Sequence, residues 1–368
     1  MLLRVLFVTH KYAPQKGGVA VSASRIVKGL VGWCSGVHVL HATREQEPAL
    51  VQSREEDEVT VFTMGETDRG AESGQLLETT IRALHQQNSY DVIIGFYAVP
   101  TGYQAVFTAA FLGLPSLLCL RGNDVDRAIY HEGQAASLRW ALERATRVVG
   151  VSRELVHKAA LFSGRNDIEF IANSVDSEEF YPEPGKAIPG RLLFCGEMRL
   201  KKGSSLLFHA LEELIGDWSL TVVGGFRGRA EADYRRWSLR NRETASRIQL
   251  LPYQRDVPRL RNLYNQAALV LNPALWDGMP NSVLEAMACG RPVLSTNVGG
   301  VKDLVQNQET GHLLQLNELE QMAQKIQQLL HSPDLESVGP NARQFVQQNH
   351  SPQREAQEFR RVLEQVVG

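Results

Sequence analysis

The residues with the clearest potential for chemistry are two carboxylates, Asp277 and Glu285, in the run ALVLNPALWDGMPNSVLEAMACGRPVLSTNVGGVKDLV over 268–305. The run predicts a buried strand, a loop that contains Asp277, Gly278 and Pro280, and then a helix. Carboxylates commonly lie on solvated surfaces, so each of them alone is weak evidence for a site. Their place around the start of one short helix is what makes them candidates.

The start of this helix is a candidate anion site. Asn281 or Ser282 is expected to be its N-cap, and Gly290 is expected to stop it. The N–H groups of a first helical turn attract a phosphate. Glu285 lies about one turn in, where its carboxylate can accept hydrogen bonds from two neighbouring hydroxyls of a ribose or another sugar.

These residues need a scaffold, and the chain predicts one of alternating strands and helices. Continuous apolar runs are typical of parallel strands covered on both faces. A helix is expected over 19–31, from its apolar residues at steps of three and four. Strands are expected at RVLFVT, VHVLHA, VTVFTM, DVIIGF, SLLCL and RVVGVS in the first half, and at RLLFCGE, SLTVVGG, RIQLLP, ALVLNP and RPVLST in the second.

A segment rich in Pro and Gly, YPEPGKAIPG, separates the two series and is expected to be a linker. We therefore predict an α/β protein of two doubly wound domains, over 1–185 and 186–350. A C-terminal helix over 351–368 is expected to pack back on the first domain. Ligands of such folds bind at the carboxyl ends of the strands, commonly between two lobes.

Composition excludes several classes of protein. The 368 residues are 43% hydrophobic and 22% charged, which is ordinary for globular domains. The net charge of −2 argues against a nucleic-acid-binding protein. Four widely spaced cysteines predict reduced thiols in a cytoplasmic protein, and the ten histidines show no metal-ligand spacing. The apolar stretch over 104–120 is broken by Gly113 and Pro115, so it predicts a helix, a turn and a strand and not a membrane span.

The run over 268–305 resembles the signature of retaining GT-B glycosyltransferases of family 4, also called glycosyl transferases group 1. That signature has two carboxylates eight positions apart, as Asp277 and Glu285 are, although its first carboxylate is Glu. The resemblance implies that Asp277 contacts the donor sugar and that Glu285 holds the nucleotide ribose. It also implies that sugar and diphosphate meet the stretch Gly278, Met279, Pro280, Asn281, Ser282 and Val283.

Four further segments resemble the family, in family order. CGEMRLKKG implies Arg199 and Lys202 as the cations that neutralise the departing diphosphate, although Glu197 stands where many members have the Arg. IANSVDSEEFYP resembles the stretch ahead of the interdomain crossover. YAPQKGGVAVSA matches a first loop in which Gly17 and Gly18 let the backbone approach donor phosphate or acceptor.

The fourth segment, RGNDVD, departs most from the family pattern. Arg121 takes the place of a family histidine, and Asp124 follows it at the family's spacing. The resemblance implies that both belong to the site. From the residues alone, Arg121 pairing with a neighbouring Asp is an equally simple interpretation.

The expected activity is transfer of a sugar from a UDP- or GDP-sugar to a hydroxyl acceptor, with retention, in glycan, glycolipid or cell-envelope polysaccharide synthesis. No cofactor or metal is expected, because side chains supply the cations. Nucleic acid is not an expected partner. The resemblance leaves peripheral contact with the inner face of the membrane open, although the net charge of −5 over residues 1–185 disfavours it. The oligomeric state is also open.

Two alternatives keep the fold and change the activity. One is a GT-B nucleotide-sugar epimerase or a phosphorylase. The other is a non-catalytic nucleotide-sugar-binding subunit, which Arg121 and the shortened Asp277 suggest. Release of nucleotide with a hydroxyl acceptor, and not with inorganic phosphate, distinguishes the transferase from an epimerase or a phosphorylase. Slow hydrolysis of a donor by the purified protein distinguishes an enzyme from a binding subunit.

Overall fold

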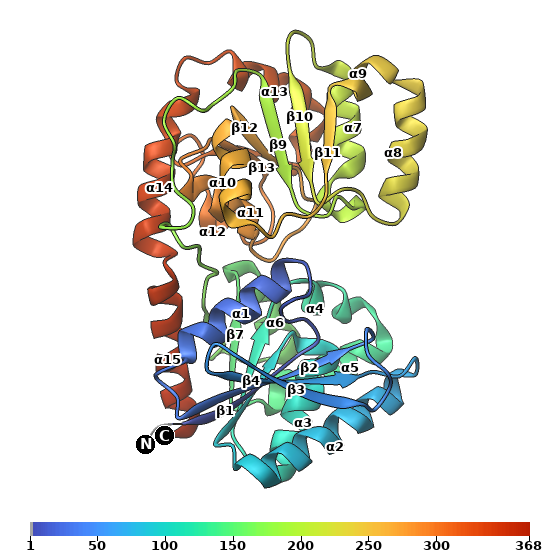
Figure 1. Cartoon of the computed structure of the whole chain (residues 1–368), viewed down its shortest axis with the longest axis vertical. Coiled ribbons are helices and arrows are strands. Elements are labelled where there is room, and N and C mark those ends of the chain that lie inside the picture. The colour runs from blue at the N-terminus through green and yellow to red at the C-terminus, as the bar shows by residue number, and fades with distance from the viewer. Residues whose placement is uncertain (1–2) are drawn as a thin grey trace. The chain divides into compact units, whose positions relative to one another are not determined.

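Two mostly parallel sheets, each covered by helices on both faces, build the computed structural model, which describes residues 3–368 (Figure 1). Each sheet has its own core, so the chain divides into two units. Unit 1 contains the chain up to Asn173 together with Pro352–Gly368, and unit 2 contains Ser174–Ser351. The expected α/β architecture of two doubly wound domains is confirmed.

The sheet of unit 1 has the order β3-β4-β2-β1-β5-β6-β7-β8, in which β3 alone runs antiparallel to its neighbour. Its strands are β1 (Arg4–Thr9), β2 (Gly36–Thr43), β3 (Val51–Glu56), β4 (Val59–Gly65), β5 (Val92–Phe96), β6 (Ser116–Leu120), β7 (Arg147–Gly150) and β8 (Glu169–Phe170). Its helices are α1 (Gly18–Leu30), α2 (Gly70–Asn88), α3 (Tyr103–Leu112), α4 (Asn123–Asp126), α5 (Glu132–Arg144), α6 (Arg153–Ser163) and α15 (Pro352–Val367), with short turns η1 (Ala98–Gly102) and η2 (Ala128–Tyr130).

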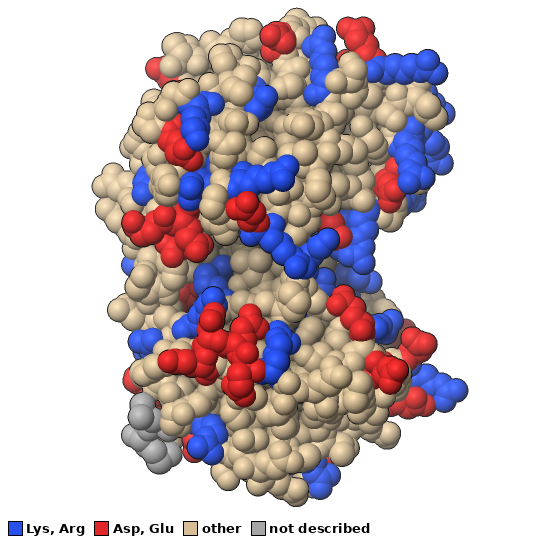
Figure 2. All heavy atoms as spheres, in the orientation of Figure 1, with Lys and Arg blue, Asp and Glu red and all other residues tan. Residues whose placement is uncertain are grey.

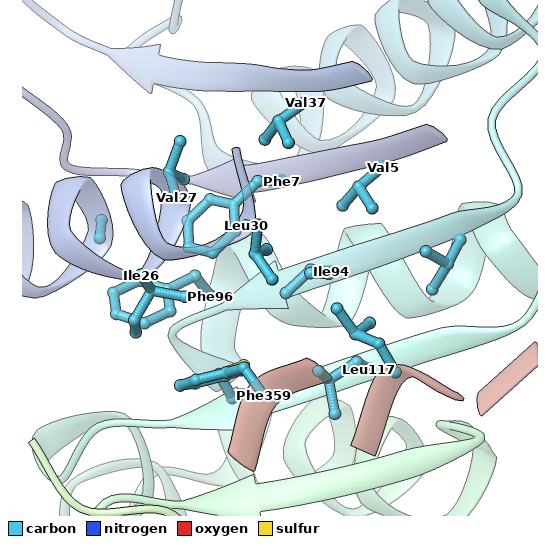
Figure 3. Close-up of a cluster of buried hydrophobic side chains, with 14 of the residues drawn as sticks. Val5, Phe7, Ile26, Val27, Leu30, Val37, Ile94, Phe96, Leu117 and Phe359 are labelled. Atoms are coloured by element: carbon cyan, nitrogen blue, oxygen red, sulfur yellow. The ribbon is translucent and has the colours of Figure 1, made fainter. Parts of the chain in front are cut away.

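Successive residues of β1 point to opposite faces of this sheet, as strand geometry requires. Val5 and Phe7 pack in a core with α1 and α15, which contributes the buried Phe359 (Figure 3). Leu6 and Val8 pack in a second core with α2 and α3. Burial on both faces explains why this strand is a continuous apolar run.

The sheet of unit 2 is entirely parallel, in the order β11-β10-β9-β12-β13-β14. Its strands are β9 (Arg191–Cys195), β10 (Ser219–Val223), β11 (Ile248–Leu251), β12 (Leu269–Asn272), β13 (Val293–Thr296) and β14 (His312–Leu314). Its helices are α7 (Ser204–Glu213), α8 (Arg229–Arg240), α9 (Arg242–Ser246), α10 (Val257–Gln266), α11 (Asn281–Ala288), α12 (Val301–Leu304), α13 (Met322–Leu330) and α14 (Val338–Asn349), with short turns η3 (Leu200–Lys202), η4 (Leu316–Gln321) and η5 (Leu335–Ser337).

The unit boundary differs from the predicted boundary at residue 185. The segment that follows Asn173 packs on unit 2, where the backbone N–H of Glu183 donates to Asn265 Oδ1 at 2.7 Å and Arg343 donates to the carbonyl of Phe180 at 3.0 Å. The Pro- and Gly-rich segment over 181–190 therefore packs on unit 2 and is not a free linker.

Candidate functional site

The centre of the unit 2 site is an ion pair between Lys202 and Asp277, which are 75 positions apart. Strands β9 and β12 are neighbours in the sheet although β10 and β11 lie between them in the chain. This is the switch point of a doubly wound sheet, where ligands bind at the carboxyl ends of the strands. Lys202 Nζ donates to Asp277 Oδ2, and the two side chains are only 20% and 16% exposed.

Glycines hold the two loops of this pair together. Gly203 has φ +77°, and a Cβ there would lie 1.8 Å from the carbonyl oxygen of Pro273, so only glycine fits. The N–H of Leu275 donates to the carbonyl of Lys201 at 2.9 Å. On the other side, a Cβ at Gly299 would lie 1.8 Å from the carbonyl oxygen of Asp277. Backbone packing therefore fixes the place of both Lys202 and Asp277.

Helix α11 begins directly after this loop, which corrects the predicted cap. Pro280 occupies the N-cap position, so neither Asn281 nor Ser282 does. The side chains of Met279 and Val283 are buried, which leaves these two residues their backbone atoms for contact with a ligand. The positive end of the helix dipole lies in this first turn.

Glu285 lies on α11, and its carboxylate is held by a residue that the sequence reasoning missed. The hydroxyl of Tyr264, on α10, donates to Glu285 Oε2 at 2.7 Å. Tyr264 is fully buried, and the Cys195 thiol at the end of β9 adjoins it. Burial raises the pKa of Cys195, so the thiol is neutral. The end of β9, the loop after β12 and the start of α11 thus all contribute to one region.

Arg199 also lies after β9, where its guanidinium pairs with Glu197. Arg227 reaches the same carboxylate at 3.1 Å. Burial opposes ionisation of Glu197, but the two arginines outweigh it and lower the pKa of that carboxyl. Arg199 is thus close to Lys202 in the chain, while its charge is shared with Glu197.

The remaining predicted residues belong to unit 1. Gly17 is the N-cap of α1 with φ +113°, a conformation that favours glycine, and Gly18 is the first residue of that helix. Their backbone forms the helix start, as a ligand-binding glycine loop requires. Contact of Gly17 and Gly18 with a ligand stays a prediction.

Arg121 follows β6 and takes part in a polar network with residues from both ends of unit 1. Its guanidinium donates to Asn173 Oδ1 and lies 4.8 Å from the centre of the Phe96 ring. Arg25 donates to the same Asn173 oxygen at 3.2 Å and to both carboxylate oxygens of Glu355 on α15, at 2.6 and 3.1 Å. Burial lowers the pKa of Arg121 to about 10, which leaves it charged at neutral pH.

Asp124 does not pair with the Arg121 side chain. Its carboxylate accepts hydrogen bonds from the backbone N–H groups of Ala98 at 2.7 Å and Arg121 at 3.0 Å. Burial raises the pKa of Asp124 to about 6, although these bonds oppose the rise. Asp126, two positions on, is held by Lys158 at 2.9 Å. These contacts hold the loop, and a contact of Asp124 with substrate stays a prediction.

Within residues 3–368, no group of three or more His, Cys, Asp or Glu side chains is placed to hold a metal ion. None of the helices in that same range is long and apolar enough to cross a bilayer.

The arginine-rich helix α8 presents basic side chains at the surface of unit 2 (Figure 2). They are interleaved with acids of the same helix, since Arg235 pairs with Glu231 at 2.6 Å and Arg236 with Asp233 at 2.5 Å. The acids partly neutralise the arginines of this solvated face. Exposed pairs of this kind contribute little to the free energy of unfolding.

Comparison with known proteins gives matches over both units. Residues 17–174 match the family model described as glycosyl transferase 4-like domain, and residues 189–332 match glycosyl transferases group 1. An uncharacterised glycosyltransferase of Methanocaldococcus jannaschii is 24% identical over 261 residues, 71% of each chain. The D-inositol 3-phosphate glycosyltransferase of Rhodococcus jostii is 30% identical over 184 residues, 46% of this chain and 40% of the relative.

Solved structures show the same fold over nearly the whole chain. Sucrose-phosphate synthase from Thermosynechococcus elongatus superposes with a TM-score of 0.80 at 20% identity, covering 99% of this chain and 98% of that one. HepE of Anabaena, solved in complex with UDP-glucose, superposes with a TM-score of 0.79 at 16% identity, covering 98% and 99%. With both sheets matched by family models and by these folds, the chain belongs to the group 1 glycosyltransferases.

Proposed function

We propose that this glycosyltransferase moves a hexose from a UDP- or GDP-sugar to a hydroxyl acceptor with retention of anomeric configuration. The observation that carries the proposal is the convergence of Lys202 and Asp277 at the switch point of the unit 2 sheet, directly before the helix α11 that carries Glu285. The structural relative solved with UDP-glucose supports this class of donor.

Each side chain has a role that follows from its charge. Cleavage of the glycosyl–phosphate bond puts negative charge on the β-phosphate and oxocarbenium character on the sugar. Lys202 and Arg199 oppose the first charge together with the start of α11, and all three are fixed before the reaction. Asp277 contacts hydroxyls of the sugar, and Glu285 accepts hydrogen bonds from the ribose.

The acceptor hydroxyl attacks from the face that the phosphate leaves. The bond from the anomeric carbon to the acceptor oxygen forms as the bond to the phosphate oxygen breaks, and the departing phosphate takes the hydroxyl proton. Backbone atoms of Gly17 and Gly18, with Arg121 and Asp124, belong to the acceptor-side unit in this proposal. The reaction needs no metal, because side-chain cations neutralise the diphosphate.

The proposal is tested with Lys202→Ala, using Lys201→Ala as a neighbouring control of equal charge. A thermal-shift panel of nucleotide sugars first identifies the donor, because a ligand stabilises the folded state that binds it. Donor turnover is then measured with hydroxyl acceptors and with inorganic phosphate. Loss of one fixed electrostatic group lowers rates by ~10²–10³, so Lys202→Ala is expected to fall in that range.

The control and the products decide the outcome. Lys201→Ala is expected to keep most of the turnover, and both variants are expected to melt near the wild-type temperature. Undiminished turnover by Lys202→Ala contradicts the assignment of this lysine. Nucleotide release that requires inorganic phosphate and not a hydroxyl acceptor identifies a phosphorylase instead.

A further inference from the structure

A buried phenol points at the carboxylate that the proposed function assigns to the ribose. Tyr264 lies on α10 and is fully buried, and its hydroxyl donates to Glu285 Oε2 at 2.7 Å. The Phe180 ring meets the Tyr264 ring edge-on with centroids 6.1 Å apart. A phenol in this position has its ring fixed by packing, and its hydroxyl is held by the Glu285 carboxylate with the Cys195 thiol beside it.

The hydroxyl keeps its proton, and so remains a donor, at neutral pH. Burial raises the pKa of Tyr264 well above its usual value, and the neighbouring Cys195 and Glu285 raise it further. A hydrogen bond from a neutral donor to a carboxylate is stronger than one between neutral groups. Burial also raises the pKa of Cys289, at the end of α11, to about 12. The thiols of Cys195 and Cys289 are therefore both uncharged at neutral pH.

We infer that Tyr264 is a positioning residue, which holds the Glu285 carboxylate in the orientation that receives the ribose hydroxyls. The inference rests on the proposed function, because it takes the ribose role of Glu285 from there. A carboxylate on a long side chain loses rotamer freedom when it binds a ligand, and a hydrogen bond already made removes part of that cost. Tyr264 therefore contributes to nucleotide affinity without touching the nucleotide.

Calorimetry with two ligands separates this role from a structural one. The probes are UDP or GDP, whichever the wild type binds more tightly, and its 2′,3′-dideoxy analogue, which lacks the ribose hydroxyls. Tyr264→Phe is expected to weaken binding of the ribonucleotide by about 3- to 10-fold, which corresponds to the net contribution of one ordinary hydrogen bond. Its effect on the dideoxy analogue is expected to stay below about twofold, because the analogue lacks the ribose hydroxyls that Glu285 binds.

Three further variants make the test complete. Glu285→Gln is expected to weaken ribonucleotide binding, and adding Tyr264→Phe to it is expected to change nothing more, since the two act through one contact. Glu285→Asp retracts the carboxylate from the hydroxyl and repeats the effect with Tyr264 intact. Tyr90→Phe is the control, because Tyr90 is also buried and its hydroxyl forms a hydrogen bond with His38 Nδ1 at 2.8 Å in unit 1.

The outcomes separate a failure of the Tyr264 inference from a failure of the proposed ribose role of Glu285. If Glu285→Gln weakens binding and Tyr264→Phe does not, positioning is overturned and the ribose role stands. Equal loss for the ribonucleotide and its dideoxy analogue in Tyr264→Phe shows a structural role only, which also overturns the inference. If Glu285→Gln leaves affinity unchanged, the ribose assignment itself fails. Melting temperatures report folding, and Glu285→Asp supplies the same comparison if Tyr264→Phe does not fold.

Discussion

Lys202 forms an ion pair with Asp277 in this structure. The proposed function also requires the charge of Lys202 to neutralise a diphosphate. Removing the negative charge with Asp277→Asn frees the lysine and removes a carboxylate that repels the diphosphate. Even an exposed pair is worth roughly 0.2–1 kcal/mol, so UDP or GDP is expected to bind up to about fivefold more tightly. Sugar transfer is expected to slow, because the carboxylate for the sugar hydroxyls is lost.

Titration calorimetry and donor turnover measure these two effects separately. Weaker nucleotide binding by Asp277→Asn contradicts this account, since it shows that Lys202 needs the carboxylate to orient it. Asp277→Glu is the matched variant. It keeps the charge and is expected to leave nucleotide affinity close to that of the wild type.

Individual site residues could be predicted from the sequence, but the contacts between them could not. Asp277, Glu285 and Lys202 were chosen by motif, but nothing in their spacing says that Lys202 bonds Asp277 across 75 positions. Tyr264 was missed because an aromatic residue on an amphipathic helix normally signals core packing. Its hydroxyl matters only once the fold places Glu285 within 2.7 Å.

The loops after β9 and β12 are joined by backbone packing at Gly203, and this contact can be broken selectively. Gly203→Ala adds both the strain of φ +77° and a clash with the Pro273 carbonyl, whereas Gly164→Ala has the same φ with nothing within 4 Å of its Cβ. Backbone strain alone costs of order 1–3 kcal/mol. Gly203→Ala is therefore expected to destabilise more than Gly164→Ala and to lower donor turnover as well.

Urea unfolding and turnover assays test this difference. Equal destabilisation by the two variants, with turnover retained in Gly203→Ala, would show that the two loops adjust without losing the Lys202–Asp277 geometry. The expected result instead shows that the position of Lys202 depends on Gly203, where the loop after β9 contacts the loop after β12.

Among the elements, strands in apolar runs were predicted, and strands that are polar or only two or three residues long were not. β1 and β9 are apolar runs that form central strands of their sheets. β3, with sequence VQSREE, is exposed and lies at the edge of its sheet, so it has no apolar periodicity to detect. β8 has two residues and β14 has three, too few to show a pattern. Tertiary pairing alone makes these three segments strands.

At the scale of the whole molecule, the chain builds unit 1, then unit 2, and returns to unit 1 with α15. Phe359 of that helix is 1% exposed in the unit 1 core, and Phe194 of β9 is 1% exposed in the unit 2 core. The proposed donor contacts of Lys202, Asp277 and Glu285 all belong to unit 2. Stability of unit 1 and nucleotide binding are therefore expected to respond to different changes.

Scanning calorimetry tests this separation with Phe359→Ala and Phe194→Ala. A buried Phe→Ala change costs roughly 3–5 kcal/mol, which lowers a melting temperature by roughly 10 °C for a unit of this size. Phe359→Ala is expected to lower one transition, and Phe194→Ala the other. UDP or GDP is expected to raise only the transition that Phe194→Ala lowers, because ligand stabilises the unit that binds it. A single transition that moves with both variants and with nucleotide would instead mean that the two cores unfold together, so that donor binding in unit 2 also stabilises unit 1.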